Sequence, residues 1–359
     1  MKMTKSILMT CAATALVALQ ADAKIWRVNN NGYNADFAQI NQAVSDPNVL
    51  AGDTLYVEGS TVTYNNGIIT KTLTIMGAGY YLADNPKTSN NGLISQMQEI
   101  KFNTGSENSQ LIGMCVNSSL GIDINVSNIT IRRNWISSNI ALQENISNIT
   151  IAQNYFENSN SSSSAVTSSS LGFPTNVRFN NNIVKRPLVI ADNTTYTFLE
   201  CNNNIFDLAV VPTSGYSLQF YAASFKNNIL VNSSASVKIN GITDFTATPN
   251  AAVSHNIGTS SVVHFGTAND NLVISNISSI WNTATAASPD GKYQLANNSA
   301  ASGSGYAGVD RGAFGGAAVS NRYTLSGLAP IPVIYEVSTS GVATPSTGLD
   351  ITIKSRTIE

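Results

Sequence analysis

A short pattern recurs six times in this chain of 359 residues. Each copy has apolar residues that alternate with polar ones, then a polar pair, an Asn and a large apolar residue. The copies lie at Ile129–Trp135, Ile149–Tyr155, Val177–Ile183, Leu199–Ile205, Ala223–Ile229 and Ala252–Ile257. The repeated residues are Asn134, Asn154, Asn182, Asn204, Asn228 and Asn256, at spacings of 20, 28, 22, 24 and 28 residues. Self-similarity with a period of about 20–30 residues is typical of a solenoid.

The alternation within each copy predicts a strand with one buried face, as in Ile129-Thr130-Ile131. Coils of about 22 residues that carry such strands predict a parallel β-helix, an all-β solenoid whose strands pair with those of neighbouring coils. Asn tolerates the left-handed conformation, so we expect each repeated Asn to occupy the same tight bend. Their side chains would then stack about 4.8 Å apart and form a hydrogen-bonded ladder.

The N-terminus has the features of a secretory signal. Lys2 and Lys5 precede an apolar stretch at residues 7–19, and residues 21–23 form an A-x-A cleavage site. We therefore expect a signal peptide at residues 1–23 and a protein that is secreted, periplasmic or at the cell surface. The apolar stretch is too short for a membrane span, and no later segment approaches one.

The mature chain would carry a small negative charge. Removal of residues 1–23 takes away two of the 19 basic residues and one of the 21 acidic residues, which leaves 17 minus 20, or −3. This charge gives no broad positive field for nucleic acid or anionic membrane. No Cys or His spacing suits a metal, so we expect neither metal nor cofactor.

Both ends of the solenoid need caps, because end coils otherwise expose strand edges and core. Residues 35–45 predict an N-terminal cap helix, with Phe37, Ile40 and Val44 on one face and Asp36 at its start.

At the other end, residues 325–337 and 348–356 are interpreted as strands of a small C-terminal β element. The predicted organisation is a β-helix domain over residues 24–318, cap included, and this element over residues 319–359.

Several longer motifs resemble a known family. They are "GDTLYVEGS" (52–60), "LTIMGAGY" (73–80), the "NITIRRN"-type rungs, "GKYQLANNSAASGSGYAGVDRGAFGG" (291–316) and "LSGLAPIPVIYEV" (325–337). In these the chain resembles right-handed parallel β-helix proteins secreted by Bacteroidetes-type bacteria, within the pectin lyase-like group. The resemblance covers nearly the whole mature chain and implies a right-handed β-helix. The wider group contains pectate lyases, polygalacturonases, alginate-type lyases and phage tailspikes, so the fold does not select an activity.

The catalytic motifs of those enzymes do not occur in the sequence. Polygalacturonase-like enzymes use aspartates in "NTD" and "DD" motifs together with "HG" and "RIK", none of which occurs here. Pectate lyase-like enzymes need a carboxylate cluster for Ca²⁺, whereas the acidic residues here are scattered singly.

One column of charged residues is a candidate for catalysis. Glu157, Lys185 and Asp207 each lie three positions after a ladder Asn and should stack on successive coils. The two carboxylates would then be about 9.6 Å apart, near the upper limit for an inverting glycosidase. The alternatives are glycan binding by the trio or a surface ion-pair ladder, as for Arg178 and Glu200 in another column.

Four basic residues are candidates for binding acidic sugars: Arg132, Arg133, Lys185 and Arg186. The first two lie about two coils from the last two. The four residues are interpreted as a clamp for uronate or sulfate groups, or as a solvated face. The Ser-rich insertion Ser159–Ser170 leaves the charged column after Glu157 and is a candidate groove wall.

Three functions therefore remain open. The first is a monomeric protein that binds polysaccharide without cleaving it. The second is a polysaccharide lyase or glycoside hydrolase with a non-standard site near Glu157, Lys185 and Asp207. The third is a structural or adhesive surface protein with a protein partner.

Overall fold

The computed structural model describes residues 23–32, 34–157, 163–169, 171–190, 198–208, 215–231, 236–259, 265–283, 288–341, 343 and 348–358. The predicted signal peptide, apart from its last residue, and part of the Ser159–Ser170 insertion lie outside the described residues.

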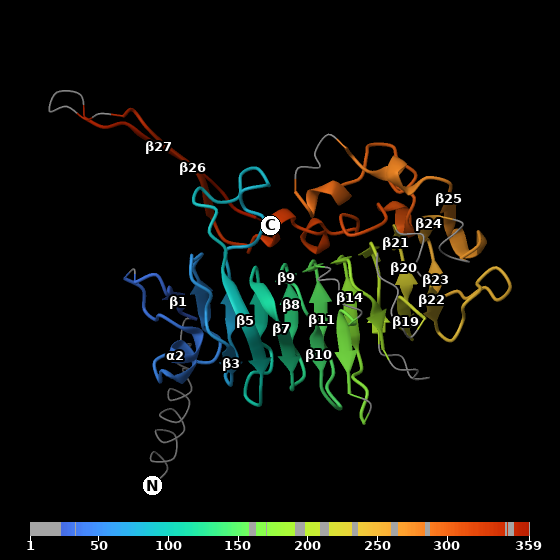
Figure 1. Ribbon diagram of the computed structural model, residues 1–359, viewed down its shortest axis with the longest axis horizontal. Helices are drawn as coiled ribbons and strands as arrows, with labels where there is room; N and C mark the ends of the chain where they lie inside the picture. Colours follow the sequence, from blue (N-terminus) through green and yellow to red (C-terminus); the bar gives the residue numbers. More distant parts are fainter. Residues whose placement is uncertain are drawn as a thin grey trace, which may run out of the picture.

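Two large sheets of parallel strands form the body of the protein (Figure 1). The eight-stranded sheet has the spatial order β1 (Ile25–Val28), β2 (Thr54–Val57), β4 (Thr74–Met76), β6 (Gln110–Ile112), β8 (Thr130–Arg132), β11 (Thr150–Ala152), β14 (Val177–Asn180) and β17 (Phe198–Glu200). The 12-stranded sheet has the order β13 (Val166–Ser168), β10 (Ile140–Leu142), β7 (Cys115–Ile124), β9 (Trp135–Ile136), β12 (Tyr155–Phe156), β15 (Ile183–Val184), β18 (Ile205–Phe206), β21 (Ile229–Leu230), β24 (Ile257–Thr259) and β25 (Leu272–Ile274), with β5 (Gln96–Phe102) beside β7 and β3 (Gly67–Ile69) beside β5.

Smaller elements make up the other helices and strands of the described residues. Parallel strands form two further sheets, β16 (Leu188–Val189), β19 (Leu218–Phe220) and β22 (Val237–Ile239), and β20 (Phe225–Lys226) with β23 (Val253–Ser254). The antiparallel pair is β26 (Val333–Thr339) and β27 (Ile351–Arg356). The helices are α2 (Ile40–Ser45) and the short 3₁₀ helices η1 (Ala268–Asp270), η2 (Ile277–Ile280), η3 (Gly291–Tyr293), η4 (Tyr306–Gly308), η5 (Val319–Asn321) and η6 (Leu325–Gly327).

The repeat accounts for this arrangement. Ile131, Ile151 and Phe179 occupy the same position in successive copies, pair in register across β8, β11 and β14, and are fully buried. They belong to one large hydrophobic core that extends along the coils. The strands therefore form the all-β parallel solenoid that the repeat predicts.

The repeated Asn side chains form a continuous ladder inside the solenoid. Each Nδ2 donates to the Oδ1 of the next ladder Asn at 3.0–3.1 Å, from Asn134 through to Asn256. The same Oδ1 accepts the backbone N–H of the preceding ladder Asn at 2.8–3.0 Å. The structure adds a seventh member, Asn271, whose Oδ1 accepts from Asn256 at 3.1 Å. Because all six predicted residues are fully buried, these bonds satisfy amides that water cannot reach.

The left-handed bend lies one residue earlier than we predicted. Positive φ values of 56–60° occur at the residue before each ladder Asn, namely Arg133, Gln153, Asn181, Asn203, Asn227 and His255. The residue with positive φ bends the chain. The side chain of the following Asn therefore points into the coil, whereas the side chain of the residue with positive φ lies outside it. Our expectation that the ladder Asn itself takes this conformation was wrong.

The large apolar residue after each ladder Asn belongs to a second, outer core. In β12, Tyr155 lies in this outer core, whereas its neighbour Phe156 lies in the main core, because successive strand residues point to opposite faces. Ile183, Ile205 and Ile229 continue the outer column in register. The C-terminal part of the chain covers this column and buries it.

Residues 301–328, here called the C-terminal strap, run over this outer core and along the left-handed bends (Figure 1). Side chains at the bends bind the strap backbone: Arg133 to Leu328, Gln153 to Ser320 and Arg322, Asn181 to Ala313 and Gly315, Asn203 to Asp310, and Asn227 to Tyr306. The strap therefore crosses the coils in the reverse of their order.

The helix near the N-terminus is shorter than predicted. Its N-cap is Gln39, and Asp36 instead accepts the backbone N–H of Arg27 at 2.7 Å. Phe37 forms a parallel bridge with Val28, so its backbone is engaged with a strand and cannot join the helix. The prediction that the helix starts at Asp36 was therefore wrong.

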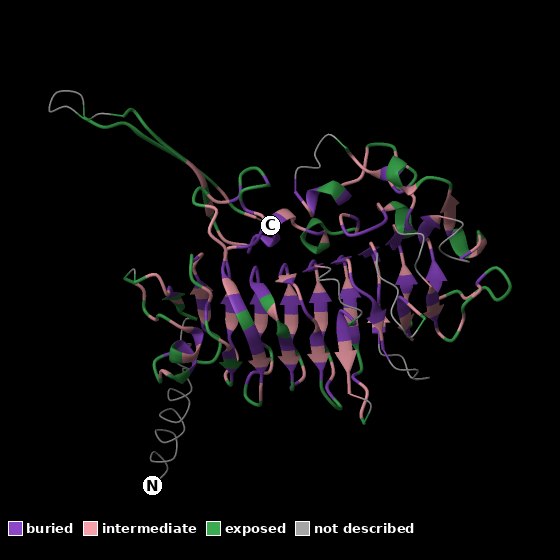
Figure 2. Ribbon diagram, viewed as in Figure 1, coloured by how far each residue is buried: buried purple, intermediate pink, exposed green. Residues whose placement is uncertain are grey.

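The C-terminal element is an antiparallel hairpin that projects from the body, and most of its residues are exposed (Figure 2). Its first strand begins at Val333, later than the predicted segment 325–337, because Leu325–Gly327 forms a 3₁₀ turn of the strap. The second strand, Ile351–Arg356, lies within the predicted segment 348–356.

Candidate functional site

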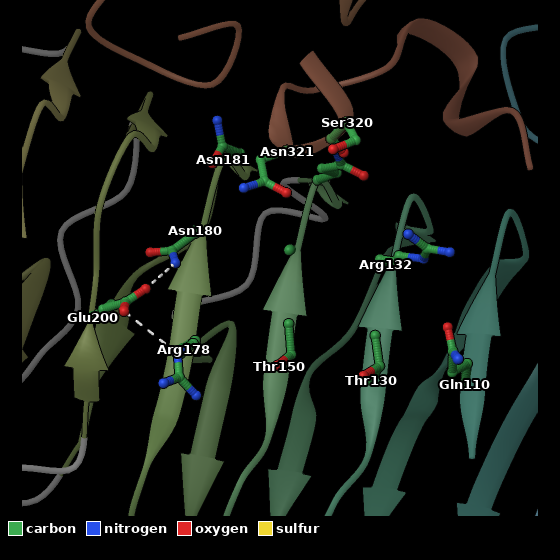
Figure 3. A pocket seen from close by; sticks show the side chains of 12 residues that line it. Gln110, Thr130, Arg132, Thr150, Arg178, Asn180, Asn181, Glu200, Ser320 and Asn321 are labelled. Atoms are coloured by element: carbon green, nitrogen blue, oxygen red, sulfur yellow. Dashed lines mark hydrogen bonds and ion pairs between the residues drawn. The ribbon is translucent and has the colours of Figure 1, made fainter. Parts of the chain in front are cut away.

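A polar hollow of about 420 Å³ lies on the outer face of the eight-stranded sheet (Figure 3). Strands from β6 to β17 form its floor, and Ser320 and Asn321 of the strap line one side. Its principal side chains are those of Thr130, Thr150, Arg178, Glu200, Arg132 and Asn180. Side chains with hydroxyl, amide or charged groups therefore make up most of its lining.

Strand register brings these side chains together. Thr130, Thr150, Arg178 and Glu200 pair directly with one another across β8, β11, β14 and β17. Residues two positions later, such as Arg132, point to the same face because side chains alternate along a strand. The floor is thus a grid whose rows repeat about every 4.8 Å.

A second hollow of about 540 Å³ lies next to the first one. Glu200 lines both, and the second extends over Lys226 to strap residues that include Tyr306. We call the two hollows together the strap groove. It crosses the strands and follows the axis along which the coils stack.

The charges in the strap groove are unevenly paired. Glu200 accepts from Asn180 at 2.7 Å and lies 3.4 Å from Nε of Arg178, as the dashed lines of Figure 3 show. The predicted pairing of Arg178 with Glu200 is therefore confirmed. Nε of Arg132 is buried without a hydrogen-bond partner, and burial lowers the pKa of this guanidinium from its ordinary value.

Tyr306 presents an aromatic ring at the far end of the strap groove. The residue is 55% exposed, and its backbone N–H donates to the Asn227 side chain at 2.7 Å. Nζ of Lys226 lies 4.7 Å from the ring centroid, and His255 makes an edge contact with centroids 5.5 Å apart. These contacts fix the ring while leaving much of it accessible.

The predicted trio lies elsewhere, beside the outer core on the 12-stranded sheet. Lys185 and Asp207 donate their backbone N–H groups to Phe156 and Val184, which places Glu157, Lys185 and Asp207 on successive coils as predicted. Lys185 lies 3.0 Å from Glu157.

Asp207 has partners of its own within the C-terminal part of the chain. Nζ of Lys292 lies 3.9 Å from its carboxylate, and the hydroxyl of Tyr293 donates to the same oxygen. The trio is therefore two separate charge pairs, rather than one Lys held between two carboxylates.

Aromatic hydroxyl groups surround these carboxylates. Tyr81 donates to Glu157 at 2.9 Å and accepts from the indole N–H of Trp135 at 2.9 Å. Burial and the adjacent Glu157 raise the pKa of Tyr81, and burial and Asp207 raise that of Tyr293. Both phenols therefore remain protonated donors at neutral pH, which suits structural hydrogen bonds better than proton abstraction.

We expect Glu157→Gln to lower the free energy of unfolding by about 1–2 kcal/mol, because charge-assisted bonds to Lys185 and Tyr81 become neutral ones. Urea unfolding measures this difference. The matched control is Glu336→Gln, which removes the charge from an exposed pair with Lys354 and should leave stability unchanged. A Glu157→Gln protein that is as stable as wild type would contradict the structural role of Glu157.

The four predicted basic residues do not form a clamp. Arg132 lines the strap groove, whereas Arg133 is buried beneath the strap and donates to Leu328. Lys185 pairs with Glu157, and Arg186 lines a separate serine-rich hollow. Adjacent residues point to opposite sides of the chain, so neighbours in sequence reach different surfaces.

Sequence reasoning missed Tyr306 and Lys226 as site residues. Tyr306 lies on the strap, far from the repeats in sequence, and no local pattern places it over the coils. Glu200 and Arg178 were noted only as an ion pair, although they form the floor of the strap groove.

Within the described residues, no helix has the length and apolar character needed to cross a membrane. Compared with protein-family models, curated proteins and solved structures, the chain gives no match.

Proposed function

We propose that this protein binds a polysaccharide chain in the strap groove and does not cleave it. The observation that carries this proposal is that Glu200 lines both hollows, which lie one after the other along the axis of the coils. A linear polymer fits a long shallow channel whose polar rows repeat at a regular interval. Hydroxyl and amide groups along the floor suit sugar hydroxyls, and Tyr306 offers a face for a sugar ring.

The surroundings of Glu157, Lys185 and Asp207 support binding rather than catalysis. Both carboxylates already have partners, and the neighbouring phenols are held protonated. A lyase or hydrolase with a non-standard site remains the alternative that a product assay would reveal.

We also propose that the solenoid is a right-handed β-helix of the pectin lyase-like group, exported from the cell and acting as a monomer. The rung motifs and the signal-like N-terminus support this proposal. The stacked parallel strands are compatible with it.

The test is a panel of neutral and acidic polysaccharides incubated with residues 24–359. Binding is followed by calorimetry, and cleavage by reducing ends and by absorbance of unsaturated products. The proposal predicts binding without product. Product that disappears in Asp207→Asn would establish an enzyme. Neither binding nor product with any glycan would favour an adhesive role through the exposed apolar side chains of the hairpin, such as Val337 and Ile353.

Tyr306→Ala should lower the affinity for the glycan at least about fivefold, because an exposed aromatic ring in a groove is a typical binding hot spot. Calorimetric affinity is the measurement. Tyr216→Ala is the control, since Tyr216 also lies near a lysine, with Nζ of Lys238 5.9 Å from its ring, but outside the strap groove. Equal losses in both variants would place the glycan elsewhere.

A further inference from the structure

We infer that the strap groove selects a glycan whose acidic groups are spaced apart along the chain, with one acidic group bound to Arg132. The inference rests on the proposed function and names the class of glycan. The acidic group is a carboxylate or a sulfate, both of which present oxygen atoms in the geometry that a guanidinium binds.

Arg132 is a cation of the first hollow that no described carboxylate balances. Its Nε is buried and has no hydrogen-bond partner, and none of the described carboxylates pairs with it. In Figure 3, dashed lines join Glu200 to Arg178 and Asn180, whereas none reaches Arg132. Because Arg132 lines the hollow and no described carboxylate balances its charge, an oxyanion of a ligand in the groove would pair with the guanidinium.

The rest of the floor limits how many acidic groups the ligand can carry. Between Arg132 and Glu200 the groove has the neutral side chains of Thr150 and Asn180, which suit uncharged sugar hydroxyls, and Arg178, whose charge Glu200 balances. Glu200 lines both hollows, and a chain with an acid on every unit would bring like charge against it. A densely charged polymer is therefore disfavoured.

A second cation lies beyond Glu200. Lys226 lines the second hollow beneath the ring of Tyr306, on the fourth coil after that of Arg132. Four strand spacings correspond to about 19 Å. The order along the groove is thus cation, neutral floor, carboxylate paired with Arg178, and cation, which suits acidic groups separated by neutral sugars.

Chondroitin supplies a suitable scaffold, because its glucuronate units alternate with neutral N-acetylgalactosamine, whereas the sulfated polymer carries an acidic group on nearly every unit. Calorimetry at fixed ionic strength would compare two alternating forms, unsulfated chondroitin and carboxyl-reduced chondroitin sulfate, with the form lacking both acidic groups. Chondroitin sulfate and polygalacturonate are the densely charged probes. We expect the doubly neutral form and the densely charged probes each to bind about tenfold more weakly than the best alternating form.

The two singly modified forms identify the acidic group. Tighter binding of unsulfated chondroitin assigns a carboxylate to Arg132, and tighter binding of the carboxyl-reduced sulfated form assigns a sulfate. Equal binding of the doubly neutral form would overturn the inference while leaving polysaccharide binding intact, as would tighter binding of a densely charged probe. Failure of every polymer to bind would contradict both the inference and the proposed function.

Arg132→Gln should lower the ratio of acidic to neutral affinity from about tenfold to about one, while affinity for the doubly neutral form is retained. Arg27→Gln is the charge-matched control, since Arg27 lies on the same sheet, outside the groove and paired with Glu58. It should leave the ratio unchanged. A ratio that falls equally in both variants would show that only net charge matters and would overturn the assignment of Arg132.

Discussion

Replacing Asn182 by Leu should lower the free energy of unfolding by about 3–5 kcal/mol, because it leaves several buried groups without partners. Oδ1 of Asn182 accepts from the backbone N–H and the side chain of Asn154, at 2.9 and 3.1 Å. Its Nδ2 donates to the carbonyl of Ile151 and to Asn204, at 3.0 and 3.1 Å. Leu removes all four bonds, and the interior offers no water in exchange.

Chemical denaturation followed by circular dichroism measures this loss. The control is Asn117→Leu, the same substitution at an exposed strand position of the 12-stranded sheet, where a change within about 0.5 kcal/mol is expected. Similar unfolding curves for Asn182→Leu and wild type would remove the energetic role of the ladder.

Gly327→Ala should destabilise the protein by at least about 2 kcal/mol more than Gly303→Ala, a control in the same strap. Both glycines have left-handed φ values, 56° and 61°, so the conformational cost of a side chain is similar. A Cβ at Gly327 would lie 2.2 Å from the carbonyl oxygen of Arg133 and 2.3 Å from Tyr80, whereas nothing lies within 4 Å of one at Gly303. The added methyl group must therefore push the end of the strap away from the coils.

Thermal unfolding gives the difference, and limited proteolysis within residues 301–328 shows whether the strap has detached. The structure predicts faster cleavage of the strap in Gly327→Ala alone. Equal melting temperatures and cleavage rates for the two variants would show that close packing of the strap against Arg133 does not stabilise the fold.

Local repetition explains why the solenoid could be predicted. A coil needs an inward apolar residue and a partner for its buried bend, and both needs recur at the same place in each copy, as at Ile151 and Asn154. The same six sites therefore reveal the register of the strands and the position of the ladder. The offset of the bend to Gln153 has no such signal, because Asn is common at both positions.

The strap groove could not be predicted because it joins segments that are distant in sequence. Its floor comes from residues 110–226, and its side from the strap, whose course depends on contacts such as that of Asn181 with Gly315. The apolar residues after the ladder Asn gave a hint, since an outer column such as Ile183 and Ile205 requires a cover. The sequence does not show which segment provides it.

The charged column illustrates a different limit. Spacing correctly predicted that Glu157, Lys185 and Asp207 stack, because it depends only on the repeat. It gave no information on Tyr81, Lys292 or the other groups that approach from outside and take up the hydrogen-bonding capacity of the carboxylates. Their presence changes the interpretation from a candidate active site to a structural one.

Hydrogen exchange of the protein with and without the tightest-binding glycan of the panel tests the central claim most directly. The strap groove predicts slower exchange in peptides that cover β8, β11, β14 and the strap around Tyr306. Protection confined to peptides around Glu157, Lys185 and Asp207, or the absence of any protection at saturating glycan, would contradict it.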